Sequence, residues 1–350
     1  MAADDATAGG LITDPESALA RGCWVKLICG ASNQDLPAIA DLCAVFGAAG
    51  VHCVDVAADP AVVRAAREGF AWLAARGLTV PWLMVSLSDG SDAHFRKAWF
   101  DPQLCPADCP RPCERVCPAG AIASAGGVAS ERCYGCGRCL PACPRGLIEE
   151  HEHRLDTAEI ASSLADLRPD AIEIHTAPGR AEAFDSVVTS LASAAVPLRR
   201  LAVSCGLEGH GLTPPDLSWE LWQRHQSLRR HRFRPLWQLD GRPMSGDVGS
   251  GAARAAVSLW RAMLPLAPPG PLQLAGGTND STLGLLSAAE RPAGIAFGGM
   301  ARRLLKPLLS SAQARGETLR ESPKALKEAL KLAGSLVRPW IERPLADISC

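Results

Sequence analysis

Four cysteines lie within eleven residues of the chain, and a proline follows the last of them: Cys133-x2-Cys136-x2-Cys139-x3-Cys143-Pro144. Gaps of two residues let three consecutive thiolates reach three corners of one iron-sulfur cube, and bacterial ferredoxins use this spacing. Glycines occupy two of the gaps, where a tight wrap can aim backbone N–H groups at sulfur. The pattern therefore predicts a [4Fe-4S] cluster.

A second group of four cysteines precedes the first, in the order Cys105-x3-Cys109-x3-Cys113-x3-Cys117-Pro118. Its first two gaps are one residue longer than in ferredoxins. In two-cluster ferredoxins the fourth cysteine of each motif ligates the other cluster. The same crossing predicts a [4Fe-4S] cluster on Cys133, Cys136, Cys139 and Cys117. The second set is then Cys105, Cys109, Cys113 and Cys143, for which the longer loop leaves [4Fe-4S] and [3Fe-4S] open.

Zinc is the alternative metal for clustered cysteines, but eight cysteines without an intervening histidine and with two Cys-Pro endings fit zinc poorly. Ligation by cysteine alone favours electron transfer or redox sensing over chemistry at iron. The chain's one tyrosine, Tyr134, is expected to pack over a cluster as a lid. Five arginines surround the cysteines and either compensate anionic clusters, dock an acidic redox partner or lie on a solvated surface: Arg111, Arg115, Arg132, Arg138 and Arg145.

The bulk composition excludes several classes of protein. The formal net charge of the 350 residues is −1, so no general nucleic-acid binder is indicated. The longest apolar region is interrupted by Asp41, His52 and Asp55, and we expect no membrane span. The N-terminus is acidic and lacks the apolar stretch of a secretion signal. We expect a cytoplasmic protein, in which clustered cysteines indicate metal rather than disulfides.

Short apolar runs alternate with amphipathic helical segments along most of the chain. Strands are predicted at residues 23–29, 51–57, 81–87, 171–176, 200–205, 236–240, 272–277 and 294–299. Segments such as 35–50, 60–77 and 181–195 carry apolar residues at helical intervals. Eight such units predict an α/β fold, a (β/α)8 barrel with a parallel sheet. An open doubly wound sheet is the alternative.

The cysteine block falls between the third and fourth predicted strands, where a barrel tolerates long functional insertions. We therefore predict three regions: residues 1–90 as the first part of the barrel, 91–150 as an inserted ferredoxin-like module, and 151–350 as the second part. The aromatic segment 94–100 is expected to seat the module on the barrel rim. Residues 301–317 and 322–342 are predicted to form a closing helix and an added outer helix, the latter starting at Ser322-Pro323.

Polar residues at the carboxyl ends of barrel strands should face one shared mouth. The candidates are Ser86, Ser88, Asp89, His175, Thr176, Arg180, Ser204, Cys205, Asp240, Arg242, Ser245, Asp247 and the segment CGASNQD at residues 29–35. A lone histidine at a strand end is more often a hydrogen-bonded core residue than an acid or base, and we interpret His175 so. Cys29, Cys53 and Cys205 are expected to be buried apolar residues. No catalytic pair stands out, and whether the protein is an enzyme stays open.

Paired glycines follow the last two predicted strands, where barrels usually bind phosphate and flavin mononucleotide enzymes bind their cofactor. Gly276, Gly277, Gly298, Gly299 and Arg302 are thus candidates to hold a flavin or another phosphate-bearing ligand. The alternative is that these glycines only permit turns and close packing.

Several long stretches outside and inside the cysteine block resemble the cyanobacterial light-dependent period family, and the likeness covers nearly the whole chain: residues 24–60, 81–90, 105–122, 137–149, 236–249 and 272–279. The resemblance implies an iron-sulfur protein on the input side of the circadian clock, with the eight block cysteines as cluster ligands. It also implies that clock components such as KaiA and the kinase CikA are partners.

Two main functions follow as expectations. A redox sensor would exchange electrons with the quinone pool or an electron-transfer protein and change its contacts with clock partners. An oxidoreductase would instead pass electrons from the clusters to a flavin or another phosphate-bearing cofactor at the barrel mouth. A scaffold whose clusters only stabilise the insertion is the third possibility.

Overall fold

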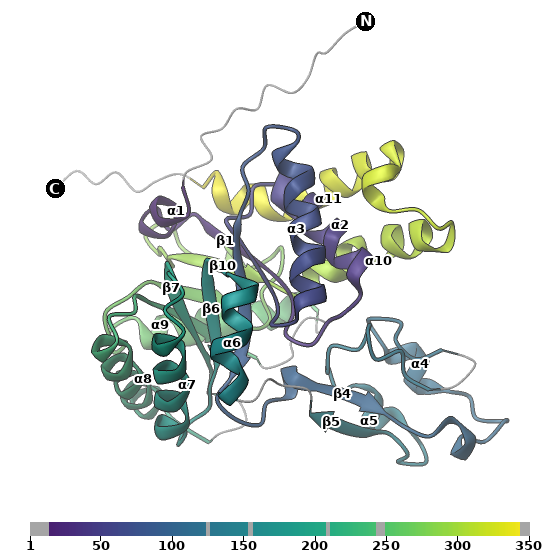
Figure 1. The fold of residues 1–350 in the computed structure, drawn as a ribbon, viewed down its shortest axis with the longest axis horizontal. Coiled ribbons are helices and arrows are strands. Elements are labelled where there is room, and N and C mark those ends of the chain that lie inside the picture. Colours follow the sequence, from purple (N-terminus) through teal and green to yellow (C-terminus); the bar gives the residue numbers. More distant parts are fainter. Residues whose placement is uncertain (1–13, 124–126, 153–156, 208–210, 243–248, 344–350) are drawn as a thin grey trace, which may run out of the picture.

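The computed structural model describes residues 14–123, 127–152, 157–207, 211–242 and 249–343. Eight parallel strands close into a barrel, in the order β1-β10-β9-β8-β7-β6-β3-β2 (Figure 1). These strands are β1 (Trp24–Gly30), β2 (Cys53–Ala57), β3 (Trp82–Ser88), β6 (Ala171–His175), β7 (Arg200–Cys205), β8 (Pro235–Asp240), β9 (Leu272–Ala275) and β10 (Gly294–Phe297). The predicted (β/α)8 barrel is confirmed, and the open sheet is excluded.

Helices cover the outside of the barrel and connect its strands. They are α2 (Leu36–Ala48), α3 (Pro60–Ala74), α6 (Thr157–Leu167), α7 (Ala181–Ser193), α8 (Pro214–Arg230), α9 (Ala253–Met263) and α10 (Gly299–Ala314). The acidic residue before a proline-containing first turn explains where two of them begin. Asp35 accepts a hydrogen bond from the Ala38 N–H, and Asp59 accepts one from the Ala61 N–H at 2.7 Å.

One connection departs from the regular alternation. Between β9 and β10 the chain forms only the 3-10 turn η4 (Leu283–Leu285), where a regular barrel would place a helix. A second short turn, η3 (Ser250–Ala252), precedes α9. The predicted strands and their order hold, and this connection has a short turn in place of the helix of a complete strand-helix unit.

The cysteine block lies in the connection from β3 to α6, at the carboxyl end of the barrel, and its ribbon extends to the lower right of Figure 1. It begins with η1 (Ala93–Phe95), β4 (Arg96–Trp99) and η2 (Pro102–Leu104), continues with α4 (Pro112–Val116) and α5 (Cys139–Ala142), and returns through β5 (Glu149–Glu152). Strands β4 and β5 pair antiparallel, with Arg96 opposite Glu152 and Trp99 opposite Glu149. This two-stranded ribbon was not predicted.

The aromatic segment at the start of the module has two roles. Phe95 is buried, and its ring meets the ring of His175 edge-on at 5.2 Å, so it seats the module on the barrel as expected. Phe100 is buried in the module's own core. Trp99, by contrast, is 49% exposed and stacks on His151, so this residue does not contact the barrel rim.

Helices α1 and α11, one near each end of the described chain, complete the fold. Helix α1 (Pro15–Arg21) packs its residues Ala18 and Leu19 with Trp24 at the amino end of β1. Past the closing helix α10, the turn η5 (Leu319–Glu321) leads to α11 (Pro323–Ile341), the added outer helix that the sequence predicts. Ser322 stands at its N-cap, without a capping hydrogen bond from its side chain. No helix within the described ranges is both long and apolar enough for a bilayer crossing.

The barrel interior is apolar at the amino ends of the strands and polar above them. Trp24 and Met84 belong to the apolar layer. In the next layer, the Lys26 ammonium contacts the carboxylate of Glu173 and lies 3.5 Å from an Asp55 oxygen. Burial opposes the charge on Lys26, but the two carboxylates outweigh it and raise the lysine pKa. A paired charge layer thus separates the apolar base from the mouth.

The buried His52, at the amino ends of the strands, should make the free energy of unfolding depend on pH. Its Nδ1 accepts the Val25 N–H at 3.1 Å, and burial lowers its pKa to about 4. An unfolded histidine titrates near pH ~6.5, so the unfolded chain binds more protons between these values and the free energy of unfolding falls as pH falls. We expect His52 to account for a loss of about 3 kcal/mol between pH 7 and pH 4.

Chemical denaturation at stepped pH would measure this contribution. In His52→Asn the amide oxygen can replace Nδ1 as the acceptor but does not titrate, so the free energy of unfolding should depend less on pH. His151→Asn, at an exposed position, is the control and should behave like wild type. An equal pH dependence in wild type and His52→Asn would contradict the assignment.

Candidate functional site

Four cysteines from both motifs surround one small cavity in the module. Cys117, Cys133, Cys136 and Cys139 line a space of about 310 Å3, together with apolar residues such as Ala98. Burial, and after it the charges of Cys136, Cys133 and Cys117, raise the pKa of the Cys139 thiol to about 12. Four such thiolates can coexist only around compensating cations.

The other four cysteines form a second group. Desolvation raises the pKa of Cys113, and the charges of Cys143 and Cys105 add to it. The pKa of Cys105 is also raised, by desolvation and then by Cys109, with a smaller effect of Cys143. The structure therefore places Cys117 beside the second motif and Cys143 near Cys105 and Cys113. The crossed ligation of two clusters stays a prediction.

Backbone amides support the thiolates at equivalent positions of both motifs. The Ala121 N–H donates to the Cys117 sulfur at 3.2 Å, and the Leu147 N–H donates to the Cys143 sulfur at 3.4 Å. In each motif the donor lies four residues after the Cys-Pro cysteine. Burial opposes ionisation of Cys143, but several such N–H groups outweigh it and lower its pKa. Across the module, the Ala98 N–H donates to Cys133 at 3.3 Å.

This arrangement fits an iron-sulfur group. Each set offers four sulfur donors, and hydrogen bonds from N–H groups to the sulfurs are typical of iron-sulfur clusters. Two of the nearby arginines are paired with protein carboxylates: Arg111 with Glu114 at 3.2 Å and Arg132 with Asp35 at 3.9 Å. The role of the individual cysteines as ligands stays a prediction.

The loop between Cys133 and Cys136 packs at Gly135 against the first residues of the module and at Tyr134 against the barrel. Gly135 has φ +72°, and a Cβ there would lie 2.2 Å from the Arg96 carbonyl oxygen and 2.5 Å from that of Ala93. Only glycine fits this close approach. The neighbouring Tyr134 ring lies 4.1 Å from the guanidinium carbon of Arg302 in a cation-π contact.

The barrel mouth holds a larger cavity of about 740 Å3. Its lining includes the predicted Ser86, His175, Asp240, Arg242, Gly276, Gly277, Gly298, Gly299 and Arg302, with Gly30 and Ala31 from the predicted segment 29–35. Tyr134 lines both this cavity and the cysteine cavity. The single tyrosine thus lies between the cysteine set and the barrel mouth, which extends its predicted role as a lid.

One residue of the glycine pairs, Gly276, also permits close packing of two backbone segments. Gly276 has φ +64°, and its missing Cβ would lie 2.5 Å from the Arg242 carbonyl oxygen. The Arg242 N–H donates to the Gly276 carbonyl at 3.1 Å. Arg302 donates through Nη1 to the Ile28 carbonyl at 2.9 Å. These contacts account for Gly276 and Arg302 without a ligand, and phosphate binding at the two glycine pairs stays a prediction.

Other predicted mouth residues lie outside the cavity lining. Asp89 accepts from Thr176 and lies 3.3 Å from Arg180, so these residues tie neighbouring strand ends together. The Ser88 hydroxyl donates to the Gly90 carbonyl at 2.6 Å. The Ser204 hydroxyl donates to Asp240 at 2.5 Å. Ser245 and Asp247 lie outside the described residues.

The predicted buried cysteines behave as small apolar side chains. Cys29 and Cys53 are fully buried in their strands, and Cys205 is 4% exposed.

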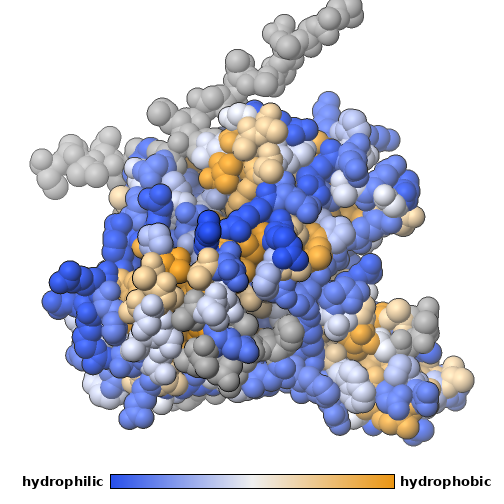
Figure 2. Space-filling model, in the orientation of Figure 1, coloured by the Kyte–Doolittle hydropathy of each residue, from blue (hydrophilic) through white to orange (hydrophobic). Residues whose placement is uncertain are grey.

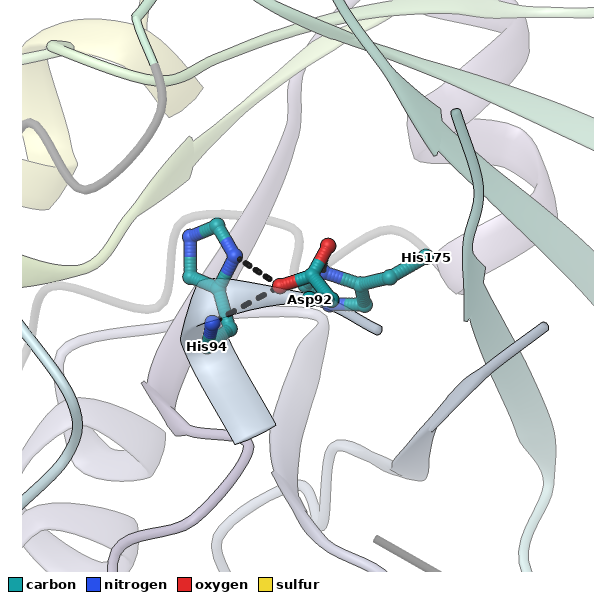
Figure 3. Close-up of side chains that lie close together, drawn as sticks. All are labelled: Asp92, His94 and His175. Atoms are coloured by element: carbon teal, nitrogen blue, oxygen red, sulfur yellow. Dashed lines mark hydrogen bonds and ion pairs between the residues drawn. The ribbon is translucent and has the colours of Figure 1, made fainter. Parts of the chain in front are cut away.

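Sequence reasoning missed the charged residues that surround His175. Glu173 Oε1 lies 3.1 Å from His175 Nε2, and Asp92 lies between His94 and His175 (Figure 3). Burial opposes protonation of His175, but hydrogen bonding to Glu173 and the nearby carboxylates raise its pKa to about 9. His175 is thus buried and hydrogen-bonded, as predicted. The alternation in the strand AIEIH could have predicted this contact, because residues two apart in a strand face the same side and Glu173 therefore points inward with His175.

Asp240 also lies on the cavity wall, and its pKa is raised to about 6, by burial first and then by the negative charge of Glu173.

Comparisons with known proteins match both parts of the chain. Residues 105–154 match the family model described as LdpA Fe-S cluster-binding domain, and residues 163–339 match the Light dependent period A C-terminal domain. The curated protein Light dependent period A of Synechococcus elongatus is 47% identical over 334 residues, which cover 93% of each chain.

Two solved structures align with most of the chain at low identity. The YdjI aldolase from Escherichia coli K12 is 9% identical with a TM-score of 0.43, over 95% of this chain and 94% of that one. A putative fructose-1,6-biphosphate aldolase from Coccidioides immitis is 12% identical with a TM-score of 0.42, over 94% of each chain. At these values the likenesses carry no argument about function.

Single serine substitutions should separate the two crossed sets. Cys117→Ser and Cys136→Ser should remove the same cluster signal in electron paramagnetic resonance and leave the other, because their sulfurs line one cavity. Cys109→Ser and Cys143→Ser should remove the other signal. Cys205→Ser, in the barrel, is the control and should keep the full iron content. Uncrossed ligation would instead group Cys117 with Cys109.

Proposed function

The chain belongs to the light dependent period A family, and on that premise we propose that it senses the cellular redox state through iron-sulfur clusters and reports this state to a circadian clock. The observation that supports the proposal is that Cys117, Cys133, Cys136 and Cys139 line one cavity, while Cys105 lies near Cys109 and Cys143, and Cys113 lies near Cys143 and Cys105. A bound cluster would accept and release single electrons. The remaining steps depend on residues of the chain.

The cysteine sets lie within reach of a redox partner. Cys105, Cys109, Cys117, Cys136 and Cys143 are partly exposed, whereas Cys113, Cys133 and Cys139 are buried. Apolar side chains beside them are also exposed, with Leu104 at 63% and Val116 at 36%. Figure 2 shows apolar and polar side chains mixed on the surface of the module. An electron donor such as a quinone or an electron-transfer protein would approach here.

A charge change at the Cys133 set has a direct structural route to the barrel. The buried Lys97 ammonium donates to the Ser130 carbonyl at 2.7 Å and to the Gln34 side chain at 2.6 Å. The Gln34 N–H donates to the Glu131 carbonyl at 2.8 Å. The segment of residues 130–135 therefore contains both the Cys133 sulfur and a backbone carbonyl, that of Glu131, which contacts the barrel rim at Gln34. A change of cluster charge would act on these contacts through Lys97, whose pKa burial lowers and Cys133 raises.

The clock components KaiA and CikA are the proposed partners that would respond. We expect their affinity for the purified protein to change by at least about fivefold, the lower range of allosteric coupling, when the protein is poised at reducing rather than oxidising potential. Binding measured at stepped potentials checks this. Cys139→Ser should abolish the dependence and Cys205→Ser should retain it. Equal affinity at all potentials in the wild type would contradict the sensor.

A second candidate is an oxidoreductase that passes electrons from the clusters to a flavin or another phosphate-bearing cofactor. It is favoured by one observation: the predicted Gly276, Gly277, Gly298, Gly299 and Arg302 all line one cavity, which Tyr134 shares with the cysteine set.

Release of a cofactor separates the two candidates. The oxidoreductase predicts a flavin or another phosphate-bearing compound in the supernatant of acid-denatured, anaerobically purified protein, detected by fluorescence and mass spectrometry at about one per chain. Arg242→Ala should lower the amount, and Arg315→Ala on the outer surface should not. A supernatant free of such a compound would contradict the oxidoreductase.

A further inference from the structure

Two imidazoles and one carboxylate meet at the barrel mouth, outside the cysteine sets. Asp92 and His94 lie on the segment that leads from β3 into the module, and His175 ends β6 (Figure 3). Asp92 Oδ1 lies 2.8 Å from His94 Nδ1, and Asp92 Oδ2 lies 3.9 Å from His175 Nδ1. One donor atom from each residue lies within 4.8 Å of the other two.

The orientation of His175 is fixed by its other ring nitrogen. Nε2 lies 3.1 Å from Glu173 Oε1, and Glu173 in turn contacts Lys26 and accepts from the Gln238 amide at 2.8 Å. A carboxylate behind one histidine nitrogen, with the other nitrogen turned to a cation, is the usual support of metal-binding histidines. This contact leaves Nδ1 facing Asp92.

Asp92 is fixed as well. Its Oδ1 accepts the His94 backbone N–H at 2.7 Å, in the turn that begins η1. Its second oxygen stays directed toward His175. The carboxylate is therefore held between the two imidazoles by the local fold of the chain, which leaves little conformational entropy to lose on binding a cation.

Two of the three residues face the large cavity, and the third is partly exposed. His94 and His175 belong to its lining. The side chain of His94 is 32% exposed and that of Asp92 19%. A cation held here would have three protein ligands and open positions toward the cavity, as in sites that bind water or a substrate oxygen.

We propose that Asp92, His94 and His175 bind one divalent first-row transition-metal ion of the zinc or ferrous type. Imidazole and carboxylate donors suit these ions, and two histidines with one carboxylate leave coordination positions open. Tetrahedral donors at about 2.1 Å from one ion lie about 3.4 Å apart. Donor atoms that now lie within 4.8 Å of one another would therefore close by up to about 1.4 Å, and the 2.8 Å contact of Asp92 with His94 would open. The ion would replace the proton that the ring nitrogen otherwise carries.

The position of the site gives the ion a structural consequence. It would join the end of β6 to residues 92–94, and Gly135 of the cysteine loop packs on the neighbouring Ala93 and Arg96 carbonyls. Open coordination positions would face the wall that holds Arg242 and Arg302, so a small molecule with a carboxylate or carbonyl oxygen is the class of ligand that fits. This proposal does not depend on the role in a clock.

Zinc binding to the anaerobic, cluster-loaded protein tests the proposal, because loaded clusters occupy the cysteines. Calorimetric titration with Zn²⁺ should give one site per chain beyond the iron. X-ray absorption at the zinc edge should show only nitrogen and oxygen neighbours at about 2.0 to 2.2 Å. Loss of a residue that only hydrogen-bonds to a metal ligand costs ~10- to 100-fold in affinity. His94 and Asp92 are themselves proposed ligands, so His94→Ala and Asp92→Asn should weaken binding by at least about a hundredfold.

Two controls keep the test decisive. His151→Ala, on the exposed strand β5, should bind zinc like wild type, and all variants should keep the iron content and circular dichroism of wild type. Asp92→Asn preserves the turn at η1, since an amide oxygen can still accept the His94 N–H. No zinc uptake, sulfur neighbours at ~2.3 Å, or equal affinity in His94→Ala would overturn the proposal and leave an ion-pair network only.

Discussion

In the proposed clusters, four thiolates of each set would meet at one point, and this requirement would fix the path of the chain from Cys105 to Cys143. Because the proposed sets are crossed, each would contain one cysteine from the opposite motif, and the two halves of the module could not separate without breaking both clusters. The module's own apolar core is small, with Phe100, Ile122 and Ile148 as its largest buried members beside three cysteines. A core of this size needs staples to be stable. Metal binding would therefore contribute directly to its folding free energy.

The barrel supplies what the module lacks, a rigid frame. Its outer face packs one continuous apolar layer against the helices, and its interior alternates between the apolar base and the charge layer of Lys26. The module contacts this frame through the buried Lys97, which donates to Gln34, and through the Tyr134 ring on Arg302. An event at the Cys133 set would thus be transmitted to the mouth through short, buried contacts, which suits a sensor as well as an electron-transfer path.

The sequence predicted the barrel because its strands are short apolar runs with regular helical segments between them, and it predicted the crossed cysteine sets because the spacing of thiolates is set by the cluster they would surround. The β4-β5 ribbon could not be predicted in this way. RKAW and EEHE carry mostly charged residues, and they form strands because they pair with each other across more than fifty residues. The Asp92, His94 and His175 trio was missed for the same reason, since its members meet only after the barrel closes.

Iron and acid-labile sulfide per chain, measured in anaerobically purified wild-type protein together with electron paramagnetic resonance after reduction, test the central claim most directly. Two crossed sets predict about seven to eight iron atoms per chain, a matching amount of sulfide and two signals from neighbouring clusters. A colourless protein with little iron, or one that carries zinc on its cysteines, would contradict the account.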